Sequence, residues 1–392
     1  MTTSASNPRV LVVGAGIGGL AAAIALRQRG VDVEVAEKRP AFTIHGVGLG
    51  QPANALRALR ALGVLDEVLA AGSEFDALRV YDQHRRLIVD HTFLLGGDVP
   101  PMAALPRADL HRILFAAAER SGVPIRTGAA VDDLTQDADR VHVTYADGTV
   151  GMYGLVVGFD GANSTIRRLL FPEAGTPAFT GYAAWRLIVE RPGDVKTMEF
   201  YQGIGSKTGV MPLTDETMYL FHVAPQPGNP WQDPERFHDA LRERLAGYTD
   251  VAGDVRDALS ASAEVVYSPI HVLLVPRPWH RGRVVLAGDA AHTVPPHLTQ
   301  GAGIALEDAL VLAEELSSDE PLSSRLETFC ERRFARCEYV HEFALAMLHA
   351  EQDIVTAEQL EEARRTGFDG MDGRLDEADR IMDADIFAPF AK

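Results

Sequence analysis

A glycine-rich turn near the start of the chain constrains the fold more than any other feature. Residues 9–30 read RVLVVGAGIGGLAAAIALRQRG, which is an apolar run, a G-x-G-x-x-G motif and a stretch of small and apolar residues. This pattern is typical of a buried strand, a tight turn and a closely packed helix whose free N–H groups can bind a pyrophosphate. A second run, DVEVAE, ends in Glu37, where a carboxylate would accept hydrogen bonds from ribose hydroxyls. The sequence therefore predicts a Rossmann-like dinucleotide-binding domain, without separating NAD from FAD.

Each glycine of the motif has a predicted role. Gly14 would permit the tight turn, Gly16 would let a phosphate approach the backbone, and Gly19 would let helix and strand pack closely. The predicted cofactor-binding residues of this region also include Ile17, Gly18, Lys38 and Arg39. The two basic residues directly after Glu37 would lie near the adenosine, as pyrophosphate or surface groups rather than as readers of a 2′-phosphate.

Composition limits the partners that we expect. The net charge is −18 and no long basic block occurs, so nucleic acid and an anionic membrane are excluded as expected partners. The most apolar stretch, Leu11 to Leu26, is too short and too rich in glycine for a membrane span. The first ten residues lack the apolar core of an export signal. With Cys330 and Cys337 expected as reduced thiols, the sequence predicts a cytoplasmic protein.

Three later segments carry further signals. Residues 153–170 (YGLVVGFDGANSTIRRLL) combine an apolar strand, an Asp-Gly pair and a helix start. Residues 282–316 combine a buried strand, a Gly-Asp pair, a proline-rich turn and a glycine-opened helix, and residues 105–118 place an arginine at a helix start. In order and spacing, these segments resemble the signature segments of the single-component flavoprotein aromatic hydroxylases. This family includes 4-hydroxybenzoate, salicylate and 6-hydroxynicotinate monooxygenases, and the resemblance covers about residues 8–350.

The resemblance implies that the bound dinucleotide is FAD, with NADH or NADPH and O₂ as co-substrates. Asp289 would accept hydrogen bonds from the ribityl chain, and the helix start at residues 301–303 would face the flavin edge where negative charge collects on reduction. The FAD contacts carried over by resemblance are Arg107, Asp160, Gly161, Gly288, Asp289, Pro296, Gly301, Ala302 and Gly303. An Asp-Gly pair after a strand is otherwise only a turn. Phe159 departs from the motif, because relatives usually have alanine there.

From about residue 177 to 271, short aromatic and β-branched runs alternate with turn residues, which is typical of an antiparallel sheet. The expected fold class is α/β: a Rossmann-like FAD-binding domain of the glutathione-reductase type with an inserted, mostly antiparallel β-sheet substrate domain and C-terminal helices. The predicted boundaries are 1–76, 105–176 and 272–350 for the FAD-binding domain, 77–104 and 177–271 for the substrate domain, and 351–392 for a C-terminal helical tail.

The predicted catalytic residues are His297, Tyr219, Lys207 and Pro296. By resemblance, the turn around Pro296 lies over the flavin ring. Its carbonyl would face the substrate, while His297 would accept a phenolic proton or bind a carboxylate. Lys207 and Tyr219 would face the same space, although a strand lysine is ordinarily a solvated rim charge and a strand tyrosine is ordinarily core. In the nicotinate enzyme the position of Lys207 is a histidine, so its base is not transferred. Reserve candidates are Trp185, Tyr201 and His222; His292 is expected to be a packed histidine, and no metal site is expected.

The resulting functional hypothesis is an FAD-dependent monooxygenase. It would use NAD(P)H and O₂ to hydroxylate a small, anionic aromatic or N-heteroaromatic substrate through a flavin hydroperoxide. The alternatives are oxygen insertion into a non-aromatic or polycyclic natural product, a flavin reductase or oxidase on the same fold, and a non-catalytic dinucleotide-binding sensor. The chain is expected to be a monomer or a homodimer.

Overall fold

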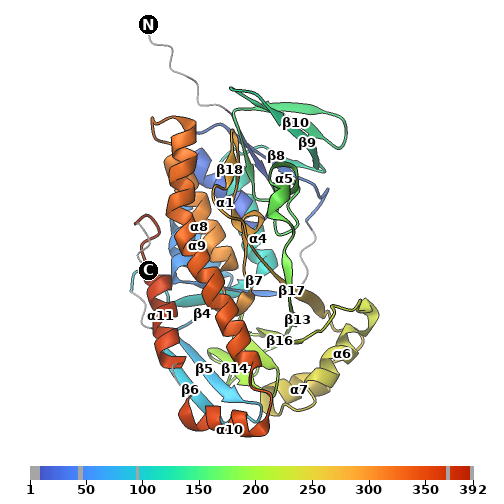
Figure 1. Cartoon of the computed structure of the whole chain (residues 1–392). Helices are drawn as coiled ribbons and strands as arrows, with labels where there is room; N and C mark the ends of the chain where they lie inside the picture. The colour runs from blue at the N-terminus through green and yellow to red at the C-terminus, as the bar shows by residue number, and fades with distance from the viewer. Residues whose placement is uncertain (1–8, 43–46, 94–96, 368–370, 389–392) are drawn as a thin grey trace.

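A six-stranded sheet carries the glycine-rich turn at the carboxyl end of one of its central strands in the computed structural model (Figure 1). The structure describes residues 9–42, 47–93, 97–367 and 371–388. Five strands of this sheet are parallel, and the sixth pairs antiparallel at one edge. In sheet order they are β18 (His280–Arg281), β19 (Val284–Leu286), β12 (Leu155–Gly158), β1 (Val10–Val13), β2 (Val33–Glu37) and β8 (Ile125–Thr127).

Helices of small and apolar residues pack around this sheet. Helix α1 (Ile17–Gln28) packs against α4 (Arg107–Arg120) and α8 (Gln300–Glu315), and its run Ala21–Ala22–Ala23 is fully buried. Small side chains allow the helices to approach closely. The shorter helices of this half are α2 (Ala53–Ala61), α3 (Leu65–Ala70) and α5 (Thr165–Leu170).

An eight-stranded sheet forms the other half of the molecule. Its strands pair antiparallel except for β14 and β5, which are parallel. In sheet order they are β20 (His292–Thr293), β17 (Val266–Leu274), β13 (Ala178–Glu190), β16 (Thr217–Pro225), β15 (Lys207–Pro212), β14 (Met198–Gln202), β5 (Ala77–Asp82) and β6 (Leu87–Thr92). The α/β fold class with an antiparallel insertion is therefore confirmed.

One face of the eight-stranded sheet is covered by α6 (Phe237–Arg244) and α7 (Asp250–Ala258). The reserve candidates Trp185 and Tyr201 are packed in the core beneath these helices, and His222 is buried beside them. Because successive strand residues point to opposite faces, these side chains point away from Lys207 and Tyr219.

Two three-stranded sheets complete the β-structure. The first contains β9 (Val131–Gln136), β10 (Val141–Tyr145) and β11 (Val150–Tyr153), and the second contains β3 (Gly48–Pro52), β7 (Met102–Pro106) and β4 (Ser73–Phe75). The second sheet contacts both larger halves, because β3 packs on α8 and on β16. The 3-10 turns are η1 (Pro172–Ala174), η2 (Pro234–Arg236), η3 (Gly288–Ala290) and η4 (Pro296–Leu298).

The long helix α9 (Leu322–Gln352) connects the two halves. It packs on α8 and on β17, and Figure 1 shows it extending from the six-stranded sheet to the eight-stranded one. It is followed by α10 (Ala357–Thr366) and α11 (Met371–Asp383). The predicted boundary at 350/351 falls inside α9, and the one at 104/105 falls inside β7, so the division into domains stays a prediction. Among the described residues, no helix combines the length and the apolar character that a membrane crossing needs.

Candidate active site

The backbone of the glycine-rich turn requires glycine at two positions. Gly14 has φ +105°, and a Cβ there would lie 2.4 Å from the carbonyl oxygen of Phe159. A Cβ on Gly19 would lie 1.9 Å from the carbonyl oxygen of Gly14. Gly16 differs, because it is exposed and no atom lies within 4 Å of its Cβ position. The space beside Gly16 is therefore open, as a pyrophosphate cradle at the start of α1 requires.

Glu37 fixes this turn from the neighbouring strand. Its carboxylate accepts a hydrogen bond from the Ala15 N–H (2.9 Å) and another from the Arg39 N–H (2.9 Å). The Nε2 atom of His111 on α4 lies 2.8 Å from the carbonyl oxygen of Ala15, within hydrogen-bond distance of the turn. Each carboxylate oxygen of Glu37 keeps a further lone pair. Ribose binding by Glu37 stays a prediction, as do the cofactor contacts of the exposed Lys38 and of Arg39.

Asp160 caps a helix. Its carboxylate accepts hydrogen bonds from the Ser164 hydroxyl (2.5 Å) and from the Thr165 N–H (2.6 Å) at the start of α5. Gly161 follows with φ +81°. The structure thus gives Asp160 a structural task, and a contact with FAD or nicotinamide stays a prediction. The ring of Phe159 lies against Gly18 and Gly288, where a Cβ would come within 2.8 Å and 3.1 Å of it.

Arg167 ties two motifs together, and sequence reasoning missed it. Its guanidinium donates to the carbonyl oxygens of Ala162 (2.6 Å) and Ala290 (2.9 Å), which belong to the Asp-Gly and Gly-Asp turns. Arg167 is buried, and burial lowers its pKa. The "RR" pair of the sequence was the available signal, but it does not show which arginine points inward.

We expect Arg167→Met to destabilise the protein by about 2 kcal/mol, because one buried and one partly buried carbonyl group lose their donor. The matched change Arg168→Met affects an exposed side chain and should stay within about 0.5 kcal/mol. Urea unfolding of both variants measures the difference. Equal effects of the two changes would contradict the role given to Arg167.

The Gly-Asp turn is held from α8. Gly288 has φ +57°, and its N–H donates to the Asp308 carboxylate (2.8 Å). The Asp289 side chain is accessible to solvent. Desolvation by the surrounding protein raises its pKa, and the positive charges of His292 and Arg107 oppose this rise. Arg107 is thus within electrostatic range of Asp289. Among the described residues, the exposed Arg107 side chain has no hydrogen-bond or ion-pair partner.

A buried charged network supports the Gly-Asp turn and the start of α8. The Asp308 carboxylate accepts hydrogen bonds from Gly288, His292 (2.6 Å) and Arg333 (2.7 Å). The remaining members are Asn54, Gln300, Glu307 and Arg336. Burial would raise the pKa of Asp308, but the charges of His292 and Arg333 lower it to about 2. Sequence reasoning missed this network.

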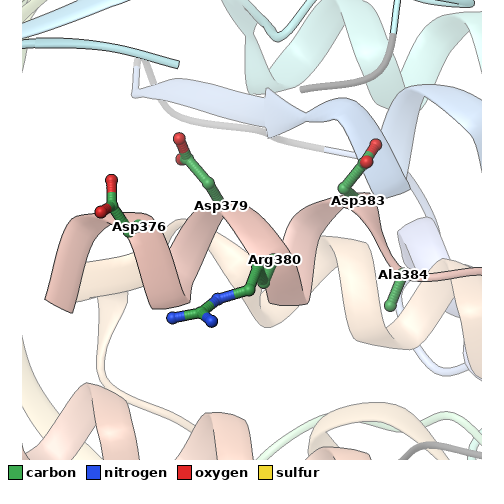
Figure 2. A pocket seen from close by; sticks show the side chains of 5 residues that line it. All are labelled: Asp376, Asp379, Arg380, Asp383 and Ala384. Carbon is green, nitrogen blue, oxygen red and sulfur yellow. The ribbon is translucent and has the colours of Figure 1, made fainter. Parts of the chain in front are cut away.

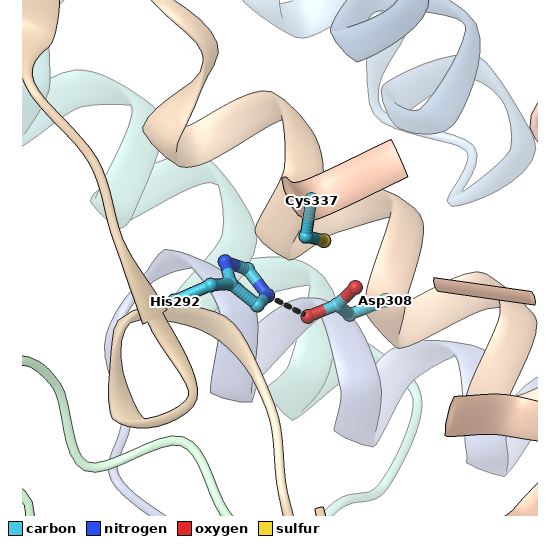
Figure 3. Close-up of side chains that lie close together, drawn as sticks. All are labelled: His292, Asp308 and Cys337. Carbon is cyan, nitrogen blue, oxygen red and sulfur yellow. Dashed lines mark hydrogen bonds and ion pairs between the residues drawn. The ribbon is translucent and has the colours of Figure 1, made fainter. Parts of the chain in front are cut away.

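Figure 3 shows His292, Asp308 and Cys337 close together in this network, with ligand atoms within 4.8 Å of one another. His292 is the packed histidine that the sequence predicts, since its side chain is fully buried and bonded to Asp308. Both oxygens of Asp308 already accept from Gly288, His292 or Arg333. These partners explain the cluster without a metal ion. Cys330 and Cys337 are both free and buried.

The start of α8 is uncrowded at Gly301. Thr299, with φ +53°, leads into the helix, and a Cβ on Gly301 would find only Val294 within 4 Å, at 3.8 Å. Ala302 is half-buried, whereas Gly303 is packed against Asn54 and Gln300. The first N–H groups of α8 are thus available to a ligand.

The turn before α8 departs in part from its predicted role. The carbonyl oxygen of Pro296 accepts a hydrogen bond from the Thr299 N–H (3.0 Å), so one of its two lone pairs is in use. The side chain of His297 is fully buried and points toward the eight-stranded sheet, with its Nε2 atom 3.4 Å from Glu351 Oε2. Neither imidazole nitrogen has a hydrogen-bond partner in the part of the chain that the structure describes.

A lysine on a strand is ordinarily exposed to solvent at the edge of the sheet, but Lys207 is not. Its side chain is 3% exposed and forms an ion pair with Glu351. Its Nζ atom also lies 4.4 Å from the ring centroid of Phe200. The prediction of Lys207 as an anion ligand did not foresee this partner. Tyr219 is buried, and burial raises its pKa against the charges of Arg186 and Arg107. The phenol therefore stays protonated and able to donate a hydrogen bond.

Strand β3 brings the sheet face to the start of α8. A Cβ on Gly50 would meet Thr299 at 3.2 Å and Met211 at 3.5 Å, and one on Gly48 would meet the Tyr219 side chain at 2.4 Å. A side chain at position 48 would displace Tyr219, and one at position 50 would crowd Thr299. The alternating glycines of residues 46–50 (GVGLG) were the signal that sequence reasoning missed.

A separate cavity of about 410 Å³ lies beside α11 (Figure 2). Its lining residues are Asp376, Asp379, Arg380, Asp383 and Ala384. None of them is a predicted site residue, so this cavity is distinct from the candidate active site.

The fold, with its glycine-rich turn between β1 and α1 and the open space beside Gly16, defines a dinucleotide-binding protein of the Rossmann-like α/β class. The profile of the family described as "FAD binding domain" matches residues 7–344. The chain belongs to this family.

Individual relatives agree with this assignment. The chain is 33% identical over 334 residues to 2-heptyl-3-hydroxy-4(1H)-quinolone synthase of Pseudomonas aeruginosa, which covers 84% of this chain and 86% of that protein. It is 30% identical over 317 residues to 6-hydroxynicotinate 3-monooxygenase of Bordetella bronchiseptica, which covers 78% of this chain and 82% of that protein. An HpxO variant of Klebsiella pneumoniae crystallised with FAD superimposes with a TM-score of 0.85 at 25% identity. The superposition covers 96% of this chain and 99% of the HpxO chain. The prediction of an FAD-dependent monooxygenase is confirmed at the level of the family.

The residues of this chain fit FAD. The open space beside Gly16 suits a pyrophosphate, the accessible carboxylate of Asp289 suits a ribityl hydroxyl, and the open start of α8 at Gly301 suits the flavin ring. Arg107, a cation without a partner among the described residues, lies within electrostatic range of Asp289.

Proposed function

We propose that this protein uses FAD, NAD(P)H and O₂ to hydroxylate a small, planar aromatic or N-heteroaromatic compound that carries an anionic oxygen. The observation that supports it most is the aromatic face of the eight-stranded sheet beside the start of α8. The rings of Tyr219 and Phe221 lie 5.6 Å apart, and those of Phe221 and Phe200 lie 5.8 Å apart. Gly209 makes room for the last two, because a Cβ there would lie 2.2 Å from Phe221.

Each part of the chain has a task in this proposal. Bound FAD supplies the acceptance of hydride from NAD(P)H and the activation of O₂. The turn at Gly14 and Gly16, Arg107, Asp289 and the start of α8 would hold it. The sheet face would exclude water and orient the substrate ring against the flavin.

Arg186 is the residue that we propose to bind the anionic group. It is half-buried on the same face as Tyr219, and its positive charge counteracts the rise in the pKa of Tyr219. Among the residues that the structure describes, its guanidinium donates a hydrogen bond to the Ser268 hydroxyl (3.1 Å), and no carboxylate lies within ion-pair distance. Lys207, by contrast, already has Glu351 as its counter-ion. One similar protein is named for an N-heteroaromatic substrate, 6-hydroxynicotinate, and another for an N-heteroaromatic product, a 3-hydroxy-4-quinolone.

The proton chemistry would involve two side chains. Tyr219 would donate a hydrogen bond to the ionised oxygen of the substrate. His297 would accept the proton from the substrate hydroxyl at Nδ1, because this nitrogen has no hydrogen-bond partner among the described residues and the imidazole is neutral at pH 7. Burial, followed by the charges of Lys207, Arg186 and His349, keeps the pKa of His297 well below its usual range.

We expect Arg186→Met to raise KM for a carboxylate-bearing substrate about 10- to 100-fold, because a charge-assisted hydrogen bond contributes about 1.5–3 kcal/mol. KM for a neutral analogue should change less than about threefold. Steady-state kinetics on matched acid and neutral compounds measures this split. A loss of the same size for both compounds would contradict anion binding by Arg186.

The function itself is tested with the purified protein. It should be yellow or become so with FAD, and hydroxylated aromatic acids and N-heterocycles should accelerate NAD(P)H oxidation. Mass spectrometry of the product formed under ¹⁸O₂ should show one labelled oxygen atom. Stimulated NAD(P)H oxidation without a labelled product would identify a reductase or oxidase instead.

A further inference from the structure

A buried trio of Lys207, Glu351 and His297 lies where the last turn of α9 meets the eight-stranded sheet. One carboxylate oxygen of Glu351 is ion-paired with Lys207 and is also 3.4 Å from His297 Nε2. Lys207 and Glu351 are 3% and 5% exposed, and the His297 side chain is fully buried. A single oxygen thus faces the Lys207 amine on one side and the His297 imidazole on the other.

The position of Glu351 is fixed by its backbone. Gln202 Nε2 at the end of β14 donates to the Glu351 carbonyl oxygen (2.8 Å), and the Gly205 N–H donates to the carbonyl of Ile354 (2.6 Å). Gln202 is 1% exposed. These bonds attach the end of α9 to the β14–β15 connection and hold the carboxylate against both partners.

Among the described residues, Glu351 is the one acidic side chain within ion-pair distance of His297. The cationic or titratable groups that face the imidazole are Lys207 on β15, Arg186 on β13 and His349 on α9, and each of them disfavours a protonated imidazole. Burial raises the pKa of Glu351, and Lys207 counteracts that rise. Glu351 is therefore the group that can compensate a positive charge on His297.

We propose that Glu351 is a positioning residue of the hydroxylation site: its Oε2 atom, 3.4 Å from His297 Nε2, would accept a hydrogen bond from Nε2–H once the imidazole turns toward it, and so leave Nδ1 as the proton acceptor. This inference rests on the proposed function, in which His297 takes the substrate proton. In that step the substrate O–H bond breaks, its electron pair stays on the substrate oxygen and the proton forms an N–H bond at Nδ1. The imidazolium then carries N–H groups at both nitrogens, and Glu351 supplies the opposite charge. A carboxylate that fixes the tautomer of a histidine acts in this way in hydrolytic triads.

The decisive experiment compares two variants by NMR with labelled histidine. Lys207→Met leaves Glu351 free to interact with His297, whereas the double change Lys207→Met/Glu351→Met removes the carboxylate without leaving a buried lysine unpaired. His297→Asn identifies the His297 signal among the 13 histidines. In Lys207→Met we expect the Nε2–H tautomer and a pKa of His297 about one pH unit or more above that of the double variant. The same tautomer and the same pKa in both variants would overturn the proposal.

A second readout uses the holoenzyme. The acid limb of the pH profile for substrate-stimulated NAD(P)H oxidation should lie at higher pH in Lys207→Met than in the double variant. Glu358→Gln, a change at an exposed position on α10, serves as the control and should leave the profile unchanged. If no compound stimulates NAD(P)H oxidation by the wild type, the proposed function fails, but the NMR comparison still decides whether Glu351 controls His297.

Discussion

Gly16→Val is expected to abolish the yellow colour of the purified protein while leaving the apoprotein folded. No atom lies within 4 Å of the Cβ position of Gly16, and its φ of −76° suits any residue, so valine creates no clash within the protein. The valine side chain would instead fill the space where the pyrophosphate meets the start of α1. We expect FAD affinity to fall at least about 100-fold, which corresponds to about 3 kcal/mol. Fluorescence titration of the apoprotein with FAD measures this change.

The control for this experiment is Gly193→Val. Gly193 also has no atom within 4 Å of its Cβ position, but it lies in the connection between β13 and β14, outside the proposed cofactor site. The FAD affinity of Gly193→Val should equal that of the wild type. The free energy of unfolding of both variants should lie within about 0.5 kcal/mol of the wild-type value. Normal FAD binding by Gly16→Val would show that the pyrophosphate does not lie at this turn.

Asp308→Asn is expected to destabilise the protein by about 3 kcal/mol, because the buried Arg333 loses one of its two carboxylate partners. The same change weakens the anchor of the Gly288 N–H, so FAD affinity should fall at least about tenfold. Denaturant unfolding and FAD titration measure the two effects. Asp319→Asn, an exposed change, should have neither effect. Full stability of Asp308→Asn would contradict the importance of the buried network.

The acid dependence of this variant follows from the lowered pKa of Asp308. A carboxyl with a pKa of about 2 in the folded state and an ordinary value near 3.8 when unfolded stabilises the protein above about pH 4. This contribution, about 2 kcal/mol, is lost as the pH falls toward 2. The free energy of unfolding should therefore fall less steeply over this range in Asp308→Asn than in the wild type.

The cofactor motifs could be predicted from the sequence because each is encoded locally. Gly14, Gly16 and Gly19 follow a strand and open a helix within a few residues, and the Gly-Asp turn at Asp289 directly follows strand β19. Backbone conformation decides such turns, and glycine marks the positions where no side chain is allowed. The family and the α/β fold therefore followed from three short segments.

The partners of the catalytic candidates could not be predicted in this way. Lys207 and Glu351 meet because the end of a long helix docks on a strand far away in the chain, and neither local sequence indicates that contact. Strand alternation would have helped in one case. Tyr219 and His222 lie three residues apart on β16, so they point to opposite faces, and His222 could have been excluded as a companion of Tyr219.

The long helix α9 has a consequence for how this protein can diversify. The segment that matches the family profile ends at residue 344, whereas the carboxylate beside Lys207 is contributed by the final turn of α9. Substitutions confined to that turn would alter the electrostatic environment of the proposed substrate site and leave the glycine-rich turn untouched. Recognition of the reactant can thus evolve independently of the prosthetic group.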